Sequence, residues 1–234
     1  MRPGTIGVIA RRDLHGFFAT PLGYLVGVPF MFLTGWLFYS SLISSRSGEL
    51  PSYFDNLHFL LLVTVPLVAM RVIAEESRTR SLDLLMVRPL SETEIVTGKW
   101  VAVVAVLAVL TGPLVPFLAF VLRASDPDLG VLGAQVASTV LLVAYLAALG
   151  VAASSLAQSQ IAAAVAATSI GLIQWFADSA SSALPSTLVN TVALRPHLAG
   201  FAYGLLSFND VAFFVLWSAI WLVCARLVVV AVRR

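Results

Sequence analysis

The chain has 234 residues, of which 59% are hydrophobic and 11% are charged, and its mean hydropathy is +0.96. An average globular domain is about 25% charged, so this composition excludes an ordinary soluble protein and also an intrinsically disordered one. The net charge of +2 is too small to indicate a nucleic-acid partner. The composition therefore predicts an integral membrane protein embedded in a lipid bilayer.

Long apolar blocks recur along the chain, and most are close to the roughly 20 residues that cross a bilayer as a helix. They lie at about residues 21–43, 57–74, 95–122, 131–153, 160–177 and 211–232. Six transmembrane helices are the simplest interpretation. The first block lacks a small-residue cleavage site and follows a segment with Arg11 and Arg12, so we expect it to stay in the mature protein. Pro66, Pro113 and Pro116 predict kinks in the second and third spans.

Basic residues are unevenly divided between the two sides of the membrane. With a cytoplasmic N-terminus, eleven of the 14 lysines and arginines face the cytoplasm, and only Arg46, Arg123 and Arg195 face outside. Cytoplasmic segments of membrane proteins are enriched in these residues. We therefore expect a multi-pass protein of the cell membrane with both termini in the cytoplasm.

Residues 1–20 precede the first span and show apolar side chains at helical spacing. Leu14 and Phe17 fall on one side of such a helix, and Arg11 and Arg12 fall on the other. This pattern is typical of a helix that lies at the membrane interface. Asp13 falls inside the apolar arc, and the alternative is an irregular basic leader.

The most charged segment of the chain joins the second and third apolar blocks, within residues 71–99. Glu75 and Arg78 stand three residues apart, and Glu76 and Arg80 stand four apart. Opposite charges at these spacings lie side by side on a helix. The pattern therefore favours a short charged helix on the cytoplasmic side.

The same segment carries signals for where this helix ends and the next one begins. Leu82 and Leu85 belong to an apolar row at helical spacing, and Pro89 ends the pattern. Ser91 to Glu94 matches a capping box that opens the third span. We expect a helix over residues 75–90 that a partner grips. The alternative is a solvated loop whose charges only fix the topology.

Two other connections have distinct compositions. The second cytoplasmic loop is short and uncharged, and Ser155 and Gln158 make it a candidate for a lesser contact. Residues 178–210, on the outer side, are too apolar for a plain loop. They predict either short helices that dip into the outer leaflet or a loop that lies on the lipid.

Small residues recur every four positions in the fifth block. Ala163, Ala167 and Gly171 form this stripe, and Gly23 and Gly27 form a shorter one. Small side chains let membrane helices approach closely. We expect helix packing within the chain, with a subunit interface as the alternative.

Residues that would carry catalysis are missing from the sequence. Lys99 is the only lysine, and Thr93 stands where a Walker A motif requires its first glycine. Cys224 is alone, and His15, His58 and His197 are far apart. We therefore assign no catalytic, cofactor-binding or metal-binding residue, expect no enzyme activity, and find little support for an intramembrane hydrolase.

Residues 74–91, AEESRTRSLDLLMVRPLS, and the continuation EIVTGKW at residues 94–100 resemble the signature of ABC-2 type transporter permeases. The resemblance is to the small gliding-motility and copper-processing type in particular. Weaker matches run through the chain, among them Leu149-Gly150 and Gly204 with Asp210.

The resemblance implies a single permease domain over residues 1–234 that is one half of a dimer, paired with an identical or a second permease protomer. It also implies that residues 75–90 are a coupling helix docked on a dimeric ABC ATPase, which binds ATP and magnesium, so that this chain holds no cofactor. Residues that match the coupling motif are Glu75, Glu76, Arg78, Leu82, Leu85, Arg88 and Pro89. The alternative function is a non-transporting scaffold or mechanical transmitter worked by the same kind of ATPase.

Overall fold

The computed structural model describes residues 3–44, 51–71, 91–124, 127–180 and 185–233. Over these residues the chain forms helices joined by turns and contains no strand. The helices are α1 (Pro3–Phe18), α2 (Pro21–Ser44), α3 (Pro51–Ala69), α6 (Glu92–Leu110), α7 (Leu114–Ala124), α8 (Leu129–Leu156), α9 (Gln160–Phe176), the short 3-10 helix η1 (Ala177–Ala180), α10 (Ser186–Val192), α11 (Arg195–Ala202) and α12 (Phe208–Arg233).

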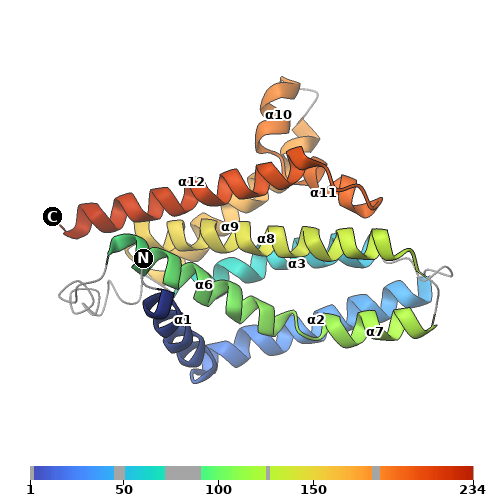
Figure 1. Cartoon of the computed structure of the whole chain (residues 1–234), viewed down its shortest axis with the longest axis horizontal. Coiled ribbons are helices and arrows are strands. Elements are labelled where there is room, and N and C mark those ends of the chain that lie inside the picture. The colour runs from blue at the N-terminus through green and yellow to red at the C-terminus, as the bar shows by residue number, and fades with distance from the viewer. Residues whose placement is uncertain (1–2, 45–50, 72–90, 125–126, 181–184, 234) are drawn as a thin grey trace.

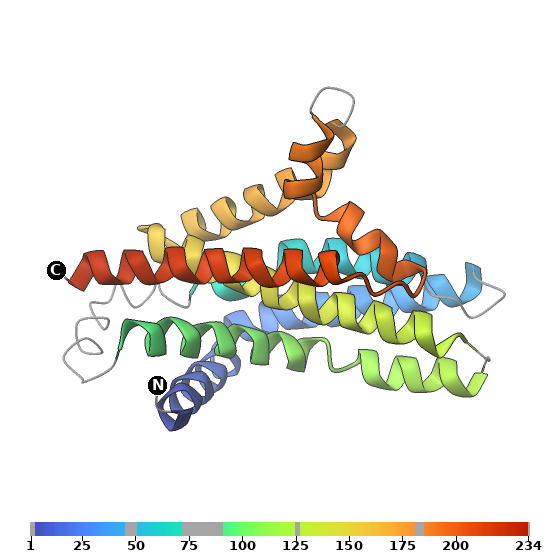
Figure 2. The same cartoon turned by 45° about the horizontal axis from the view of Figure 1, so that its top comes forward.

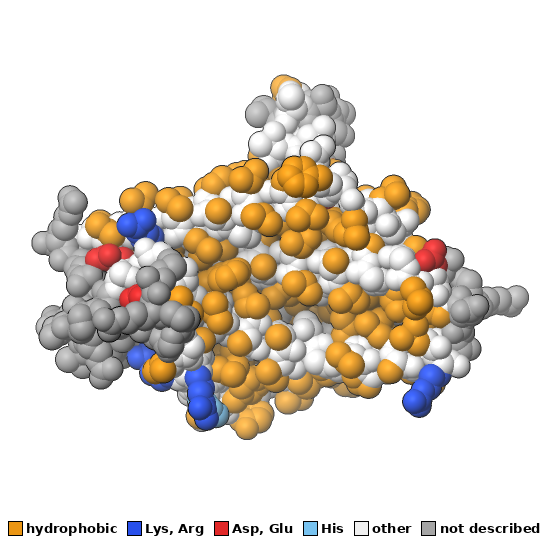
Figure 3. Space-filling view, viewed as in Figure 1, with side chains coloured by type: hydrophobic (Ala, Val, Ile, Leu, Met, Phe, Trp, Pro, Cys, Tyr) orange, Lys and Arg blue, Asp and Glu red, His pale blue; other side chains and the backbone are white. Residues whose placement is uncertain are grey.

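Six helices in the described part of the chain are long and apolar enough to cross a membrane. They are α2, α3, α6, α8, α9 and α12, which confirms the predicted all-α fold with six spans. On the face shown in Figure 3, hydrophobic side chains cover the middle of the bundle, and charged side chains lie toward its two ends. This distribution suits a protein whose middle lies in hydrocarbon.

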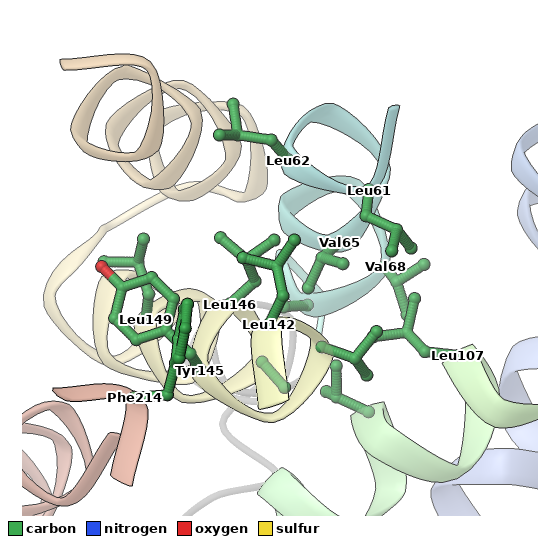
Figure 4. Close-up of a cluster of buried hydrophobic side chains, with 14 of the residues drawn as sticks. Leu61, Leu62, Val65, Val68, Leu107, Leu142, Tyr145, Leu146, Leu149 and Phe214 are labelled. Carbon is green, nitrogen blue, oxygen red and sulfur yellow. The ribbon is translucent and has the colours of Figure 1, made fainter. Parts of the chain in front are cut away.

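Helix α8 forms the centre of the bundle and contacts α3, α6, α9, α11 and α12 (Figure 1). Leu142, Leu146 and Leu149 of α8 are fully buried. Figure 4 shows them among side chains of α3, α6 and α12, such as Val65, Leu107 and Phe214. Because α8 is covered on most sides by protein, it has the largest buried share of the six spans, at 72%.

Small residues of α8 and α9 let these two helices approach α3 closely. A Cβ atom at Gly150 of α8 would lie 2.4 Å from the Cβ of Ala69 in α3. A Cβ at Gly171 of α9 would lie 3.3 Å from Leu62 of the same helix α3. Ala163 and Ala167 are also buried. The small-residue stripe of α9 is therefore used inside the chain, as the first of the two predictions states.

The third apolar block is broken rather than kinked. Helix α6 ends at Leu110, residues 111–113 form a turn, and α7 begins at Leu114. Pro113 has no N–H to donate to the preceding turn, so the helical hydrogen bonds of α6 stop before it. Pro116 lies in the first turn of α7, where a helix does not use the backbone N–H. The expectation of one kinked helix was wrong in this respect.

The start of α3 and the segment between α9 and α12 also differ from the predicted apolar blocks. Helix α3 begins at Pro51, six residues before the second block, because Tyr53 and Phe54 are buried against the bundle. The described residues between α9 and α12 form η1, α10 and α11, and α10 stands off to one side of the bundle (Figures 1 and 2). A position of these helices in the outer leaflet stays a prediction.

The turn after α11 is closed by a glycine in the left-handed region. Gly204 has φ +76°. Its N–H donates to the carbonyl of Phe201 at 3.1 Å, and the N–H of Leu205 donates to the carbonyl of Gly200 at 3.0 Å. These two bonds form a Schellman motif, which explains why glycine occupies this position before the last span.

Different helix ends and turns lie at the two ends of the bundle. The end we call the terminal end holds α1, the last turn of α3, the start of α6, the α8–α9 turn and the last turn of α12 (Figure 1). The opposite end holds the end of α2, the start of α3, the end of α7 and the start of α8. The stretch between α3 and α6 therefore leaves and rejoins the bundle at the terminal end.

Candidate functional site at the terminal end

All seven residues of the predicted coupling helix lie outside the described residues. They are Glu75, Glu76, Arg78, Leu82, Leu85, Arg88 and Pro89, within residues 72–90. The structure describes the helix ends on both sides of this stretch, at Arg71 and Ser91. These ends determine how a force on the stretch would reach the membrane helices.

The end of α3 is attached to two other helices. The carbonyl of Met70 accepts a hydrogen bond from the Ser154 hydroxyl of α8 at 3.1 Å. The guanidinium of Arg71 donates to the Thr20 hydroxyl, in the elbow between α1 and α2, at 2.9 Å. Gly150, four residues before Ser154, is the position where α8 touches Ala69. The chain therefore leaves the bundle from a point fixed by side chains of α8 and of the α1–α2 elbow.

The start of α6 is fixed by the capping box that the sequence predicts. The N–H of Glu94 donates to the Ser91 hydroxyl at 3.3 Å, and the N–H of Ser91 donates to the Glu94 carboxylate at 3.2 Å. Two backbone donors at the helix start are satisfied in this way. The capping box is confirmed.

An ion pair joins α6 to α1. The ammonium group of Lys99 lies 3.6 Å from the carboxylate of Asp13. The Lys99 side chain is only 1% exposed, whereas that of Asp13 is 18% exposed. A buried ammonium group needs a nearby counter-charge, because its transfer from water is costly. Asp13, which disturbs the apolar arc in the sequence, is therefore a partner of the only lysine in the chain.

Helix α1 presents its apolar side to the bundle. Ile9 and Phe17 are buried, and Arg11 and Arg12 are exposed, as the sequence pattern predicts for a helix. The helix approaches α6 closely, since a Cβ at Gly98 would lie 3.1 Å from the Ile9 side chain. Figure 2 shows α1 crossing below α6 at the terminal end. The position of α1 at the membrane interface stays a prediction.

The second candidate contact is the turn between α8 and α9. Ser155 donates its hydroxyl proton to the carbonyl of Ala152 at 2.7 Å, and Gln158 is exposed. Ser159 caps α9 by accepting the N–H of Ala162 at 3.2 Å. Because the neighbouring Ser154 is bonded to Met70, this turn and the exit of residues 72–90 are mechanically connected. A contact of Ser155 and Gln158 with a partner stays a prediction.

Comparison with known protein families gives a match over most of the chain. Residues 33–229 match the family described as ABC-2 family transporter protein. The chain belongs to this family. This family and the six apolar helices make the chain a multi-pass membrane permease component of an ABC transporter, a class of proteins that associates with an ABC ATPase. No curated protein matches the chain.

The matched residues of this ABC-2 permease begin inside α2, so α1 lies outside them. The family match nevertheless includes both ends of the undescribed stretch, Arg71 and Ser91, and the whole of α8. Helix α1 precedes the matched residues and is joined to them by the ion pair of Asp13 with Lys99, and the elbow after α1 is joined to them by the bond of Thr20 with Arg71.

The contacts at the terminal end of the ABC-2 permease join several helices to one another. Among the described residues, no group of three histidine, cysteine, aspartate or glutamate side chains could hold a metal ion. The contacts at this end instead connect α1, α3, α6 and α8 through hydrogen bonds and an ion pair. A displacement of either end of residues 72–90 would therefore move several helices together.

Sequence reasoning missed three of these contacts: Asp13 with Lys99, Thr20 with Arg71, and Ser154 with Met70. Each joins residues far apart in sequence, and no local pattern predicts such pairs. One signal was available, because an acidic residue on an apolar helix face and a lone lysine at the start of an apolar block both need a counter-charge.

Proposed function

We propose that this ABC-2 permease moves a substrate across or out of the membrane with ATP that a separate ATPase subunit hydrolyses. The observation that carries the proposal is the family match over residues 33–229, which includes both helix ends that flank residues 72–90. ATP and magnesium would be bound by the partner subunit, and this chain would hold neither.

The proposed docking segment is the coupling helix expected over residues 75–90. Glu75, Glu76, Arg78 and Arg88 would make polar contacts with the ATPase, and Leu82, Leu85 and Pro89 would fill a groove on it. Ser155 and Gln158 would add a smaller contact from the α8–α9 turn. Support comes from the braced helix ends, since Met70 and Arg71 on one side and Ser91 on the other are each held by side-chain hydrogen bonds.

We propose that the terminal end faces the cytoplasm of a cell membrane, with both chain termini on that side. Among the described residues, Arg11, Arg12, Arg71 and Lys99 lie at this end, whereas Arg123 ends α7 at the opposite end. This distribution agrees with the preference of lysine and arginine for cytoplasmic segments.

Transport would follow from the relative movement of two permease halves. The second half would be another copy of this chain or a second permease, so that each coupling helix docks on one of two ATPase subunits. Closure of the ATPase pair around nucleotide would displace both coupling helices. Through Ser154 and Lys99 that displacement would reach α8 and α1, and would shift the population between two arrangements of the halves.

The test begins with affinity purification of the tagged chain from its native membrane, followed by an assay of vanadate-sensitive ATP hydrolysis. We expect an ATPase subunit to be retained with activity. The double variant Glu76→Ala/Arg78→Ala should lose most of the ATP hydrolysis that depends on the permease, because the docking charges are gone. Its membrane domain should stay folded, since exposed charges contribute about 0–1 kcal/mol to stability.

A matched control is the double variant Arg46→Ala/Glu49→Ala, which removes the same two kinds of charge from the connection between α2 and α3 at the opposite end. It should hydrolyse ATP like the parent complex. Unchanged hydrolysis in a folded E76A/R78A variant would contradict the docking assignment. An ATPase that couples to this chain without any vesicle transport activity would favour the scaffold or mechanical transmitter.

A further inference from the structure

A cavity of about 220 Å³ lies near the opposite end of the bundle, away from the proposed ATPase contact. The first turns of α3 form one wall, α8 forms a second, and η1 with α11 forms the third. Asp55 and Arg195 line the cavity and are exposed, whereas His58 and Gln135 line it and are buried. The cavity therefore opens to the surface beside Asp55 and Arg195 and has a buried floor.

His58 on this floor is fixed by hydroxyl groups of α8. Its Nε2 atom lies 3.0 Å from the Thr139 hydroxyl and 3.4 Å from the Ser138 hydroxyl. Each hydroxyl has a single proton and donates it to the backbone carbonyl of Gln135, at 2.9 and 2.7 Å. The hydroxyls therefore offer only lone pairs to His58, so Nε2 carries the proton of the neutral imidazole ring.

The other ring nitrogen of His58, Nδ1, is left as a hydrogen-bond acceptor. It makes no hydrogen bond within the part of the chain that the structure describes. The described buried side-chain atoms that lack both a partner and contact with solvent belong to Asp13, Gln135, Asp178 and Trp221, so Nδ1 is accessible. Because His58 is 95% buried and lines the cavity, this lone pair faces the cavity.

The charged side chains that line the cavity leave one negative charge uncompensated. The guanidinium of Arg195 lies 3.5 Å from the carboxylate of Asp178, so these two charges offset each other. Asp55 makes no ion pair within the described chain. It stands three residues before His58 on the same face of α3. The α3 wall therefore presents a carboxylate and an imidazole lone pair, both of which accept hydrogen bonds.

We propose that the cavity binds a free primary amine with a short alkyl chain, in its ammonium form. The N–H groups donate to the Asp55 carboxylate and to Nδ1 of His58, and the positive charge balances that of Asp55. The alkyl chain lies against Phe54, Leu198 and Ala202, which belong to the apolar part of the lining. A short chain suits the cavity, which is smaller than the roughly 300–1,000 Å³ of sites for drug-sized ligands.

The binding test uses the purified chain at pH 7 in nanodiscs of phosphatidylcholine, a lipid whose head group has no N–H donor. No ATPase is present, so the result is independent of the coupling proposal. The probes are butylammonium, butyltrimethylammonium and 1-butanol, and titration calorimetry measures their affinities. We expect saturable binding of butylammonium. Butyltrimethylammonium, which has the charge but no N–H, and butanol, which has no charge, should each bind at least tenfold more weakly.

The decisive variant is Asp55→Asn, which removes the uncompensated charge and keeps the size of the side chain. It should weaken butylammonium binding at least tenfold and leave the melting temperature unchanged, because Asp55 is exposed. The matched control is Asp128→Asn, the same chemical change at the cap of α8 near this end. Asparagine caps a helix as well as aspartate does, so D128N should bind like the parent chain. Ala202→Leu, which fills the cavity from α11, should abolish binding.

Four results would overturn the proposal. The first is no saturable binding of butylammonium by the parent chain. The second is equal affinity of the parent, D55N and A202L chains for butylammonium. The third is equal affinity of the parent chain for butylammonium and butyltrimethylammonium, which would show that no N–H group is recognised. The fourth is loss of butylammonium binding when phosphatidylethanolamine is added to the disc, which would assign the cavity to a lipid head group instead of a free amine.

Discussion

The two ends of the bundle use polar groups in different ways. At the terminal end, Lys99 faces Asp13, and Met70 and Arg71 are bonded to side chains of other elements. At the opposite end, Gln135 and Asp178 line a polar cavity, and each has a buried atom without a partner in the described chain. Paired polar groups hold helices together, whereas a buried polar atom without a hydrogen-bond partner costs free energy. The terminal end has such an atom too, since the Asp13 oxygen nearest Lys99 makes no hydrogen bond within the described chain. The contacts of the terminal end thus join separate helices to one another, whereas buried polar side chains of the opposite end line a cavity.

The largest effect is expected from the ion pair at the terminal end. Asp13→Ala leaves Lys99 buried without this carboxylate, and we expect the free energy of unfolding to fall by about 2–3 kcal/mol, below the roughly 3–5 kcal/mol of a fully buried pair because Asp13 is partly exposed. Unfolding in mixed detergent micelles, followed by tryptophan fluorescence, gives the value. The double variant Asp13→Ala/Lys99→Met should recover most of the loss.

The exposed neighbour of the same carboxylate supplies the control. Arg12 also pairs with Asp13, at 2.8 Å, but its side chain is 49% exposed. Arg12→Ala should change the free energy of unfolding by no more than about 0.5 kcal/mol. Equal losses in R12A and D13A would show that the buried partner Lys99 does not depend on Asp13.

The next effect tests the contact between α8 and α3. Gly150→Ala places a Cβ 2.4 Å from that of Ala69, so the helices must separate. We expect a loss of about 1–3 kcal/mol, typical of an overpacked core. The double variant Gly150→Ala/Ala69→Gly should restore most of the stability, as measured by unfolding in the same micelles.

Helix α8 offers its own control near the opposite end. A Cβ at Gly133 would meet nothing within 4 Å. Gly133→Ala should therefore stabilise the chain by about 0.5–1 kcal/mol, because alanine favours the helical backbone. Equal changes in the free energy of unfolding for G150A and G133A would show that the close approach of α8 to α3 does not require glycine at position 150.

A third variant concerns the opposite end, where His197 joins α10, α11 and α12. Its Nδ1 atom lies 2.7 Å from the Asp210 carboxylate, and its Nε2 atom lies 2.8 Å from the carbonyl of Asn190. His197→Phe keeps an aromatic ring beside Phe213 and loses both polar contacts. We expect a loss of about 1–2 kcal/mol in the unfolding free energy.

The comparison variant for this position is His15→Phe, in α1 at the terminal end. His15 is exposed, so its replacement should change stability by less than about 0.5 kcal/mol. Indistinguishable melting temperatures for H197F and H15F would mean that the His197 contacts do not hold α10 and α11 to α12.

The smallest effect is expected at the helix caps. Ser91→Ala removes the capping box of α6 and should cost about 1 kcal/mol. Ser159→Ala removes a single cap bond from α9, where Ala162 offers no returning side chain. It should cost less than S91A in thermal unfolding. The reverse order would show that the reciprocal bond from Glu94 adds nothing to the cap.

Much of the fold could be predicted because the bilayer imposes strong local rules. A spanning helix needs an unbroken apolar stretch, and both the six blocks and the capping box at Ser91 are local patterns. The predicted kink at Pro113 became a break between α6 and α7, because Pro113 lacks the N–H that would continue the helical bonds of α6 and its ring crowds the preceding turn.

The coupling residues of the candidate site were assigned from a resemblance, and the family match supports the permease class to which that motif belongs. Their individual contacts with an ATPase remain a proposal. The residues that brace the helix ends were not predicted. In the sequence, Asp13 only interrupts the apolar side of an amphipathic helix, and its contact with Lys99 is seen only in the folded structure.

The sequence by itself determined that this protein has six apolar spans and a charged segment between the second and third, whereas the permease class came from its family resemblance. The spans and the charged segment depend on composition and on spacing along one helix. Only the tertiary structure decided that Ser154 holds Met70, and that Gln135 and Asp178 line one cavity. Such pairs join residues that are dozens of positions apart, and their partners are fixed by how α8 packs against α3 and α11, which no local pattern in the chain specifies.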